Sequence, residues 1–178
     1  MILTLSEAQA VDKDITQLEL DAYENTVREL TNNKFHHKFI QNHNLAFTGD
    51  SIIASGEVIG YQVGDTIEVI NTKYNNGLWI VVEVVDNHTL EVDTDDKELF
   101  ESTDKQAIVF KVEYPTDIKL GLLDVIKYKS KMANKVGIKS ESISRKSVTY
   151  QDVSGQDNIE GIPSSYWSFI KKHRRISW

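Results

Sequence analysis

Histidine and aspartate side chains give this 178-residue sequence its most direct candidates for metal binding. His36, His37 and His43 come first, because neutral imidazole is a common ligand of transition metals. The adjacent pair points to different sides in a helix or a strand, and no carboxylate follows at a ligand-like spacing, so we expect a polar connector. The acidic run 93–96 resembles part of a calcium loop. It lacks the glycine at position six and the glutamate at position twelve, which predicts a solvated turn.

Catalytic signatures are missing from the sequence. It has no Cys, which excludes a thiolate nucleophile, a cysteine zinc site and a disulfide framework. It also lacks Gly-x-Ser-x-Gly, the P-loop and the dinucleotide-binding fingerprint. Carboxylates are abundant, but no pattern places a pair of them in a cleft. We therefore expect a protein that is not an enzyme and that uses no metal or cofactor.

Aromatic residues in the middle of the chain raise the possibility of nucleic-acid binding. Small β-barrels bind single strands through aromatic platforms beside a basic groove. The candidate platform is Phe47, Tyr61, Tyr74 and Trp79. However, the net charge of the chain is −7, and residues 34–115 carry fourteen acids against six bases. Affinity for phosphate depends mainly on Lys and Arg, so this acidic segment is a poor nucleic-acid surface. Packing of the four aromatic residues in the barrel core is the simpler interpretation, and a single-strand-binding barrel is kept as an alternative.

The end of the chain combines basic residues with large apolar side chains. Aromatics together with Arg are typical anchors of protein interfaces. Lys171 to Arg175 could instead contact DNA phosphates, but the surrounding aromatics favour an acidic protein surface. We predict a partner-binding arm whose contacts are made by Tyr166, Trp167, Ile170, Arg174, Arg175 and Trp178.

The middle of the chain has the two-residue period of β-strands. From about residue 45 to 113, β-branched segments are separated by Gly, Asn and Asp turn signals. The clearest segments are 66–70, 78–85, 89–92 and 107–112. Five or six short strands of this kind predict a small antiparallel barrel or sandwich.

Helices are predicted before and after these strands in the sequence. The first runs from Asp14 to Thr31, and its apolar positions cover more than half of its circumference, so it needs two neighbours. The second runs from Thr116 to about Val136. Lys129 lies among its apolar positions, either as a snorkelling side chain or as a contact to an acid of an adjacent chain. Pro163 begins a last short helix, from Ser164 to His173.

Charge is divided between the two long helical segments. Residues 1–33 carry seven acids against two bases, whereas residues 116–136 carry five bases against two acids. An acidic N-terminal face and basic C-terminal segments on one subunit suit head-to-tail contact, which can close into a ring.

Two blocks of the chain, about 95 residues in all, resemble the head-tail connector (head-completion adaptor) proteins of long-tailed phages. The first block is the helix that ends at Leu30-Thr31-Asn32-Asn33. The second contains the helix that ends at Val136-Gly137, the run Ile138-Lys139-Ser140-Glu141-Ser142-Ile143, the segment Ser147-Val148-Thr149-Tyr150, and Ile162-Pro163 before a short helix and Arg174-Arg175-Ile176. The strands between the two blocks depart from the pattern of this family, because its compact members lack them.

Together with this resemblance, the elements predict an α+β chain. Residues 1–35 and 114–178 would form a small helical connector domain, with two main helices and a short C-terminal helix. Residues 36–113 would form an inserted small antiparallel β-barrel or sandwich. The resemblance implies a structural virion protein that forms a ring, commonly of twelve copies, beneath the portal after DNA packaging. That ring would receive the next neck or stopper protein, and DNA would pass through it without specific binding.

The resemblance also implies roles for particular segments. Pro163 to Trp178 would be the portal-facing arm. The inter-subunit or channel-side loop would contain Ile138, Lys139, Ser140, Glu141, Ser142, Ile143, Val148 and Tyr150. We expect the protein in the host cytoplasm during assembly and then in the neck of the virion, without a membrane partner, since no stretch approaches the roughly 20 apolar residues of a membrane span. Another neck or tail-completion protein is the alternative within the phage setting.

Overall fold

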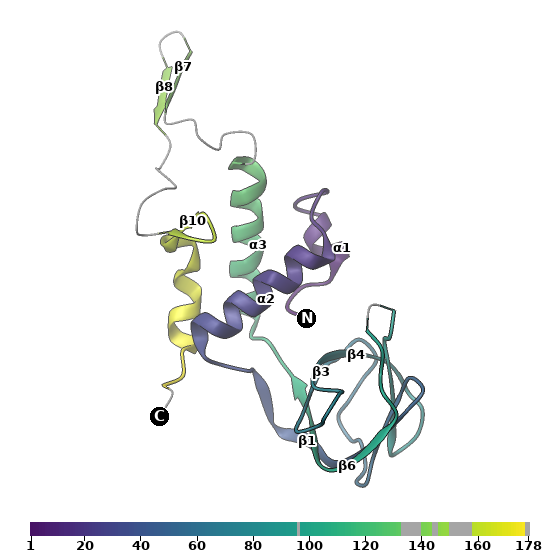
Figure 1. The fold of residues 1–178 in the computed structure, drawn as a ribbon. Coiled ribbons are helices and arrows are strands. Elements are labelled where there is room, and N and C mark those ends of the chain that lie inside the picture. The colour runs from purple at the N-terminus through teal and green to yellow at the C-terminus, as the bar shows by residue number, and fades with distance from the viewer. Residues whose placement is uncertain (96, 133–139, 144–145, 150–157, 177–178) are drawn as a thin grey trace. The chain divides into compact units, whose positions relative to one another are not determined.

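The computed structural model describes residues 1–95, 97–132, 140–143, 146–149 and 158–176. The chain divides into two compact units (Figure 1). We call residues 1–33 and 114–178 the helical unit, and residues 34–113 the barrel unit. Among the described residues, no helix combines the length and the apolar character needed to cross a membrane.

The barrel unit is a closed barrel of six antiparallel strands in the order β1-β2-β5-β4-β3-β6. β1 pairs with β6 as well as with β2, so the sheet closes on itself. The inward-facing side chains form one buried core that includes Leu45, Ile67, Trp79 and Leu90. The strands are β1 (His36–Thr48), β2 (Ser51–Ala54), β3 (Thr66–Ile70), β4 (Gly77–Val84), β5 (Thr89–Val92) and β6 (Ser102–Val112).

This barrel overturns the predicted fold class. A helical connector domain with a small inserted barrel is wrong: the described residues form a closed six-stranded antiparallel β-barrel together with four short helices. The physical reason lies in the long strands β1 and β6. Their polar segments near His36 and Ser102 show no clean alternation, yet each pairs with the apolar end of the other strand, His36 with Val112 and Ser102 with Phe47. The expected polar connector at residues 36–43 is therefore part of a barrel strand.

The helical unit contains α1 (Leu5–Gln9), α2 (Gln17–Thr31), α3 (Thr116–Met132) and the 3-10 helix η2 (Ser164–His173). α2 begins with a capping box, in which Thr16 and Glu19 each accept a backbone N–H of the other. It ends at Asn32, whose left-handed backbone (φ 47°) suits a residue that tolerates this conformation. The described residues of this unit also form two short antiparallel pairs: β7 (Ser140–Ile143) with β8 (Lys146–Thr149), and β9 (Asn158–Ile159) with β10 (Ile162–Pro163).

A mixed apolar and polar core holds the helical unit together. Its apolar part comes from α2, α3 and η2, with Val27, Ile118, Leu122, Ile126, Trp167 and Ile170 all almost completely buried. Its polar part is a chain of three side chains. The hydroxyl of Tyr114 donates to Oε1 of Glu24 at 2.7 Å, and Arg28 donates to the Tyr114 hydroxyl at 3.3 Å. Burial raises the pKa of Tyr114, so the hydroxyl stays protonated and able to donate.

Candidate functional site

The predicted partner-binding residues separate into a buried group and an exposed group. Buried Trp167 and Ile170 are only 1% and 2% exposed, and the Trp167 ring lies 6.3 Å from that of Tyr23 on α2. These two side chains therefore hold η2 onto its own unit. The exposed residues are Tyr166, Arg174 and Arg175, and Trp178 lies outside the described residues.

The backbone after η2 is fixed against the end of α2. The N–H of Arg175 donates to the carbonyl of Thr31 at 2.8 Å, and Asn33 Nδ2 donates to the carbonyl of His173 at 3.2 Å. Arg174 and Arg175 are exposed, and Ile176 is 79% exposed. The arm therefore presents two guanidinium groups and an isoleucine from a backbone that is held in place.

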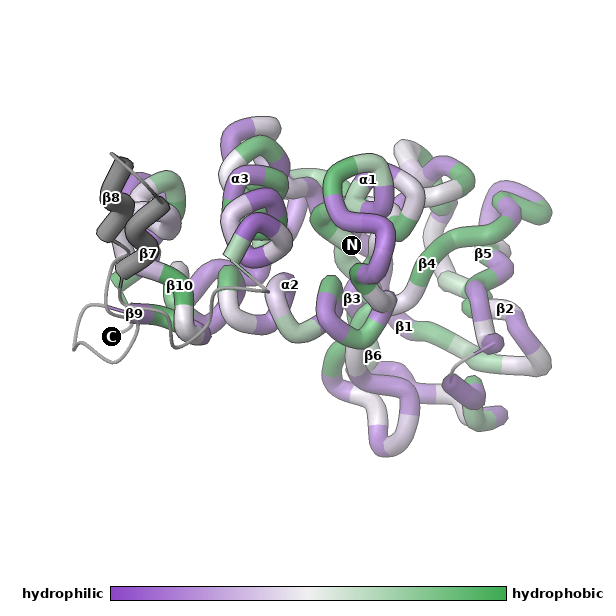
Figure 2. Tube along the Cα trace, turned by 90° about the horizontal axis from the view of Figure 1, so that it is seen from above, coloured by the Kyte–Doolittle hydropathy of each residue, from purple (hydrophilic) through white to green (hydrophobic). Residues whose placement is uncertain are grey.

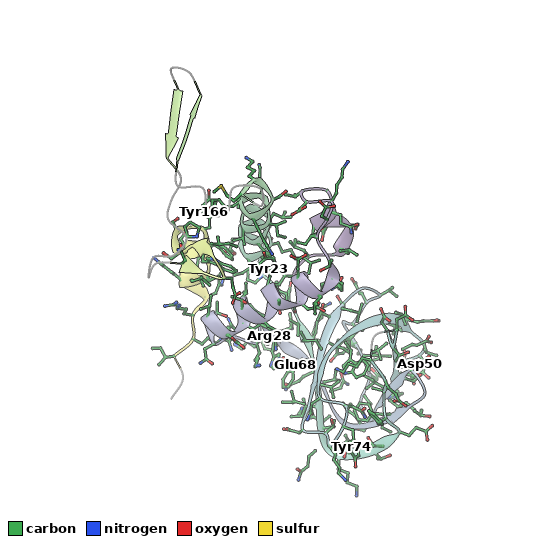
Figure 3. The ribbon with its side chains drawn as sticks, turned by 45° about the horizontal axis from the view of Figure 1, so that its top comes forward. Tyr23, Arg28, Asp50, Glu68, Tyr74 and Tyr166 are labelled. Carbon is green, nitrogen blue, oxygen red and sulfur yellow. The ribbon has the colours of Figure 1, made fainter. Side chains whose placement is uncertain are left out.

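A groove of about 480 Å³ lies between α3 and η2 of the helical unit. Two tyrosines form part of its wall: the rings of Tyr128 and Tyr166 are 4.3 Å apart, with an interplanar angle of 39°. Figure 3 labels Tyr166 on η2, next to α3. The lining residues are Gly121, Asp124, Lys127, Tyr128 and Lys131 from α3, and Ser165, Tyr166, Ser168 and Phe169 from η2.

Gly121 allows the two helices to approach closely enough to form this groove. The ring of Phe169 lies directly against it, in the space that any Cβ at position 121 would occupy. A glycine in the middle of a helix costs about 1 kcal/mol relative to alanine, so its presence here has a packing reason. Tyr128 is half-buried beside the groove, and this burial raises the pKa of its hydroxyl.

The charged residues of the groove lie on the side of α3 that faces away from α2. Lys129 marks the opposite side, because its Nζ lies 2.8 Å from Oε1 of Glu19 on α2. The acid that Lys129 contacts is thus on the same chain, which corrects the expectation of an acid on an adjacent chain. At about 100° per residue, Asp124, Lys127 and Lys131 lie about 140° to 160° around the helix from Lys129. Figure 2 shows the mixture of hydrophilic and hydrophobic residues around α3.

The predicted inter-subunit loop is described only in part. Ser140, Glu141, Ser142 and Ile143 form β7, and Val148 lies in β8, where it is the register partner of Glu141. The other three predicted residues, Ile138, Lys139 and Tyr150, lie outside the described residues.

Three of the four aromatic residues considered for a nucleic-acid platform belong to the barrel core. Phe47, Tyr61 and Trp79 are 2%, 5% and 3% exposed. Tyr74 is 55% exposed, and its ring lies 5.7 Å from that of Phe100. Core packing is therefore the correct interpretation of the first three, and they do not form a stacking surface.

His36, His37 and Asp93, three of the polar candidates for metal binding, have structural partners within the barrel unit. His36 Nε2 lies 2.7 Å from Oε2 of Glu68, and its ring stacks on Phe110 at 4.1 Å. His37 Nδ1 accepts two backbone N–H groups from the next residues of β1, and His43 lies further along this strand. In the acidic run, the N–H of Asp95 donates to Oδ1 of Asp93, which closes a turn. Within the described part of the chain, no three such side chains are grouped to hold a metal ion.

The groove residues Gly121, Tyr128 and Phe169 were not predicted from the sequence. Only Gly121 gave a signal, because an isolated glycine inside a helical pattern commonly has a packing or functional reason. A comparison with known proteins finds no matching family model and no curated protein with significant similarity. The function is therefore argued from the exposed arm, the groove and the sequence patterns.

Proposed function

We propose that this protein is a non-enzymatic structural subunit of a tailed phage, a head-tail connector. It assembles as a ring beneath the portal after DNA packaging and provides the docking site for the next neck or stopper protein. The ring forms in the host cytoplasm and remains in the neck of the virion. DNA passes through it without specific binding, which suits a chain whose net charge is −7.

The observation that carries this proposal is the exposed arm that follows η2 on the helical unit. Its backbone is held to the end of α2 by the hydrogen bond from the N–H of Arg175 to the carbonyl of Thr31. On this unit, the exposed arm at Arg174 and Arg175 offers cationic, bidentate donors, and the groove beside Tyr166 offers aromatic walls. Both features serve contact with protein surfaces, and neither needs a cofactor.

Reconstitution with the portal protein encoded in the same genome tests the proposal. The purified chain is mixed with assembled portal, and the complex is examined by sedimentation and electron microscopy. We expect a closed ring of many copies bound to the portal. A complex with one or two copies, or no binding to the portal, would show that the connector assignment is wrong. A duplex and single-stranded DNA binding assay run in parallel would reveal a nucleic-acid-binding module instead.

A further inference from the structure

The helical unit has an acidic surface on the outer side of α2. Its exposed residues are Leu18, Asp21, Ala22, Asn25 and Glu29, which carry two acids and no base. Tyr23 marks the inner side of α2, because its ring packs near Trp167. At about 100° per residue, Asp21 and Asn25 lie about 160° around the helix from Tyr23, so they point away from the core. We call this set the acidic face.

The groove between α3 and η2 is complementary to the acidic face in charge. Its lining contains the two bases Lys127 and Lys131 and the single acid Asp124, so its formal charge is +1. Both lysines are exposed, and they flank the aromatic wall made by Tyr128 and Tyr166. Cationic side chains beside aromatic rings form a surface that suits a partner with carboxylates around an apolar residue.

The acidic face carries the apolar residue Leu18, which can contact the tyrosine rings of the groove. Leu18 is 79% exposed and lies one helical turn before Asp21 and Ala22. Burying such a side chain against the tyrosine rings would remove apolar area from water on both surfaces. The nearby carboxylate of Asp21 would then lie beside Lys127 and Lys131, where opposite charges set the register.

We infer that the acidic face of one copy docks in the α3–η2 groove of the next copy. This inference rests on the proposed multi-copy assembly and names the contact between neighbours. The two surfaces differ from each other and lie on outward sides of different helices, so the contact is head-to-tail. A contact of this kind either closes into a ring or continues as a filament, depending on the rotation between neighbours.

Engineered cysteines provide a direct test, because the natural chain has none. The variant Asp21→Cys is mixed with the variant Lys127→Cys under mild oxidation, and disulfide-linked dimers are measured on non-reducing gels. A disulfide needs Cα atoms within about 7 Å, so only close pairs are captured. The matched control mixes Asp21→Cys with Lys105→Cys, an exposed lysine of the barrel unit. We expect several-fold faster linkage of the first pair, and slower linkage at about 1 M salt, where the Debye length is about 3 Å.

Reversal of the charges on the acidic face and in the groove gives a second, independent test of the contact. Asp21→Lys with Glu29→Lys makes the outer side of α2 basic, and Lys127→Glu with Lys131→Glu makes the groove acidic. Each double variant alone should lose self-association in sedimentation, and an equal mixture of the two should regain it. Linkage of Asp21→Cys to Lys127→Cys no faster than the control would overturn the inferred contact, even if the protein assembles on the portal. Specific linkage without any closed ring on the portal would leave the contact standing and overturn the connector proposal.

Discussion

Replacement of Trp167 tests whether this residue belongs to the core of the helical unit. Its side chain is 1% exposed and packs near the rings of Tyr23 and Phe169, at centroid distances of 6.3 and 6.2 Å. Truncating a buried Trp to Ala costs about 3 to 5 kcal/mol. However, Nε1 of Trp167 is buried without a hydrogen-bond partner among the described residues. An unsatisfied donor already costs about 1 to 3 kcal/mol, so we expect the Trp167→Ala loss near the lower limit, about 3 kcal/mol.

Trp167→Phe separates the two contributions. It keeps most of the apolar contact and removes the unsatisfied N–H, so it should cost about 1 kcal/mol or less. Urea unfolding followed by circular dichroism gives the free energy of unfolding, and hydrogen exchange in η2 localises the change. Tyr166→Ala, on the exposed side of the same helix, is the matched control and should change stability by about 0.5 kcal/mol or less. A loss below about 1 kcal/mol for Trp167→Ala, or a larger loss for Phe than for Ala, would refute this reasoning.

Four further variants probe the two units. Gly121→Ala should destabilise the helical unit in thermal unfolding, although alanine is the better helix former by about 1 kcal/mol, because its Cβ would collide with the Phe169 ring. Hydrogen bonds from Lys129 and from the Thr16 backbone N–H hold the pKa of Glu19 below its ordinary value of 4.5. Its carboxylate therefore stabilises the fold above pH 4.5, and this stabilisation is lost as pH falls through the lower folded pKa. Glu19→Gln should therefore lose less stability than the natural protein when urea unfolding is compared at about pH 5 and pH 3, and an equal loss would contradict the assignment. Asn75→Ala should cost the barrel about 2 to 4 kcal/mol in urea, because the buried amide donates to the Phe100 carbonyl and accepts its N–H, both at 2.8 Å. Arg174→Ala with Arg175→Ala should leave unfolding unchanged and weaken sedimentation with the portal, and loss of DNA affinity instead would reassign the arm.

The barrel shows where sequence patterns define strands and where they do not. Segments 66–70 and 89–92 alternate between apolar and polar residues, and they form β3 and β5 at the expected positions. β1 gives no such signal over its first half. Its register shifts between His36 and Gln41, where four residues oppose the single residue Lys111 of β6. A bulge of this kind breaks the period of two, and the strand is then defined by its hydrogen bonds to a segment about 70 residues away.

The candidate site shows a second reason why sequence patterns alone do not predict which residues bind a partner. Aromatic and apolar residues near the end of a chain have the same composition whether they form an interface or a core, since both environments bury large apolar area. Trp167 and Ile170 belong to the core, and Tyr166 lies on the surface, because η2 packs one side on α2 and α3. The groove joins Tyr128 to Tyr166, 38 positions apart in the sequence, and no local periodicity couples such distant residues.

Burial also determines which charges of the helical unit are left for a partner. Residues 1–33 contain seven acids, but several of these have structural roles. Glu7 and Glu19 complete the capping boxes of α1 and α2, and Glu24 is 4% exposed, where it accepts the hydroxyl of Tyr114 from 90 residues later in the chain. Substitution of those acids would change folding before it changed assembly. Asp21 and Glu29 lie on the outer side of α2, where charge can be reversed with little effect on the core, so they are the positions at which assembly and folding can be measured separately.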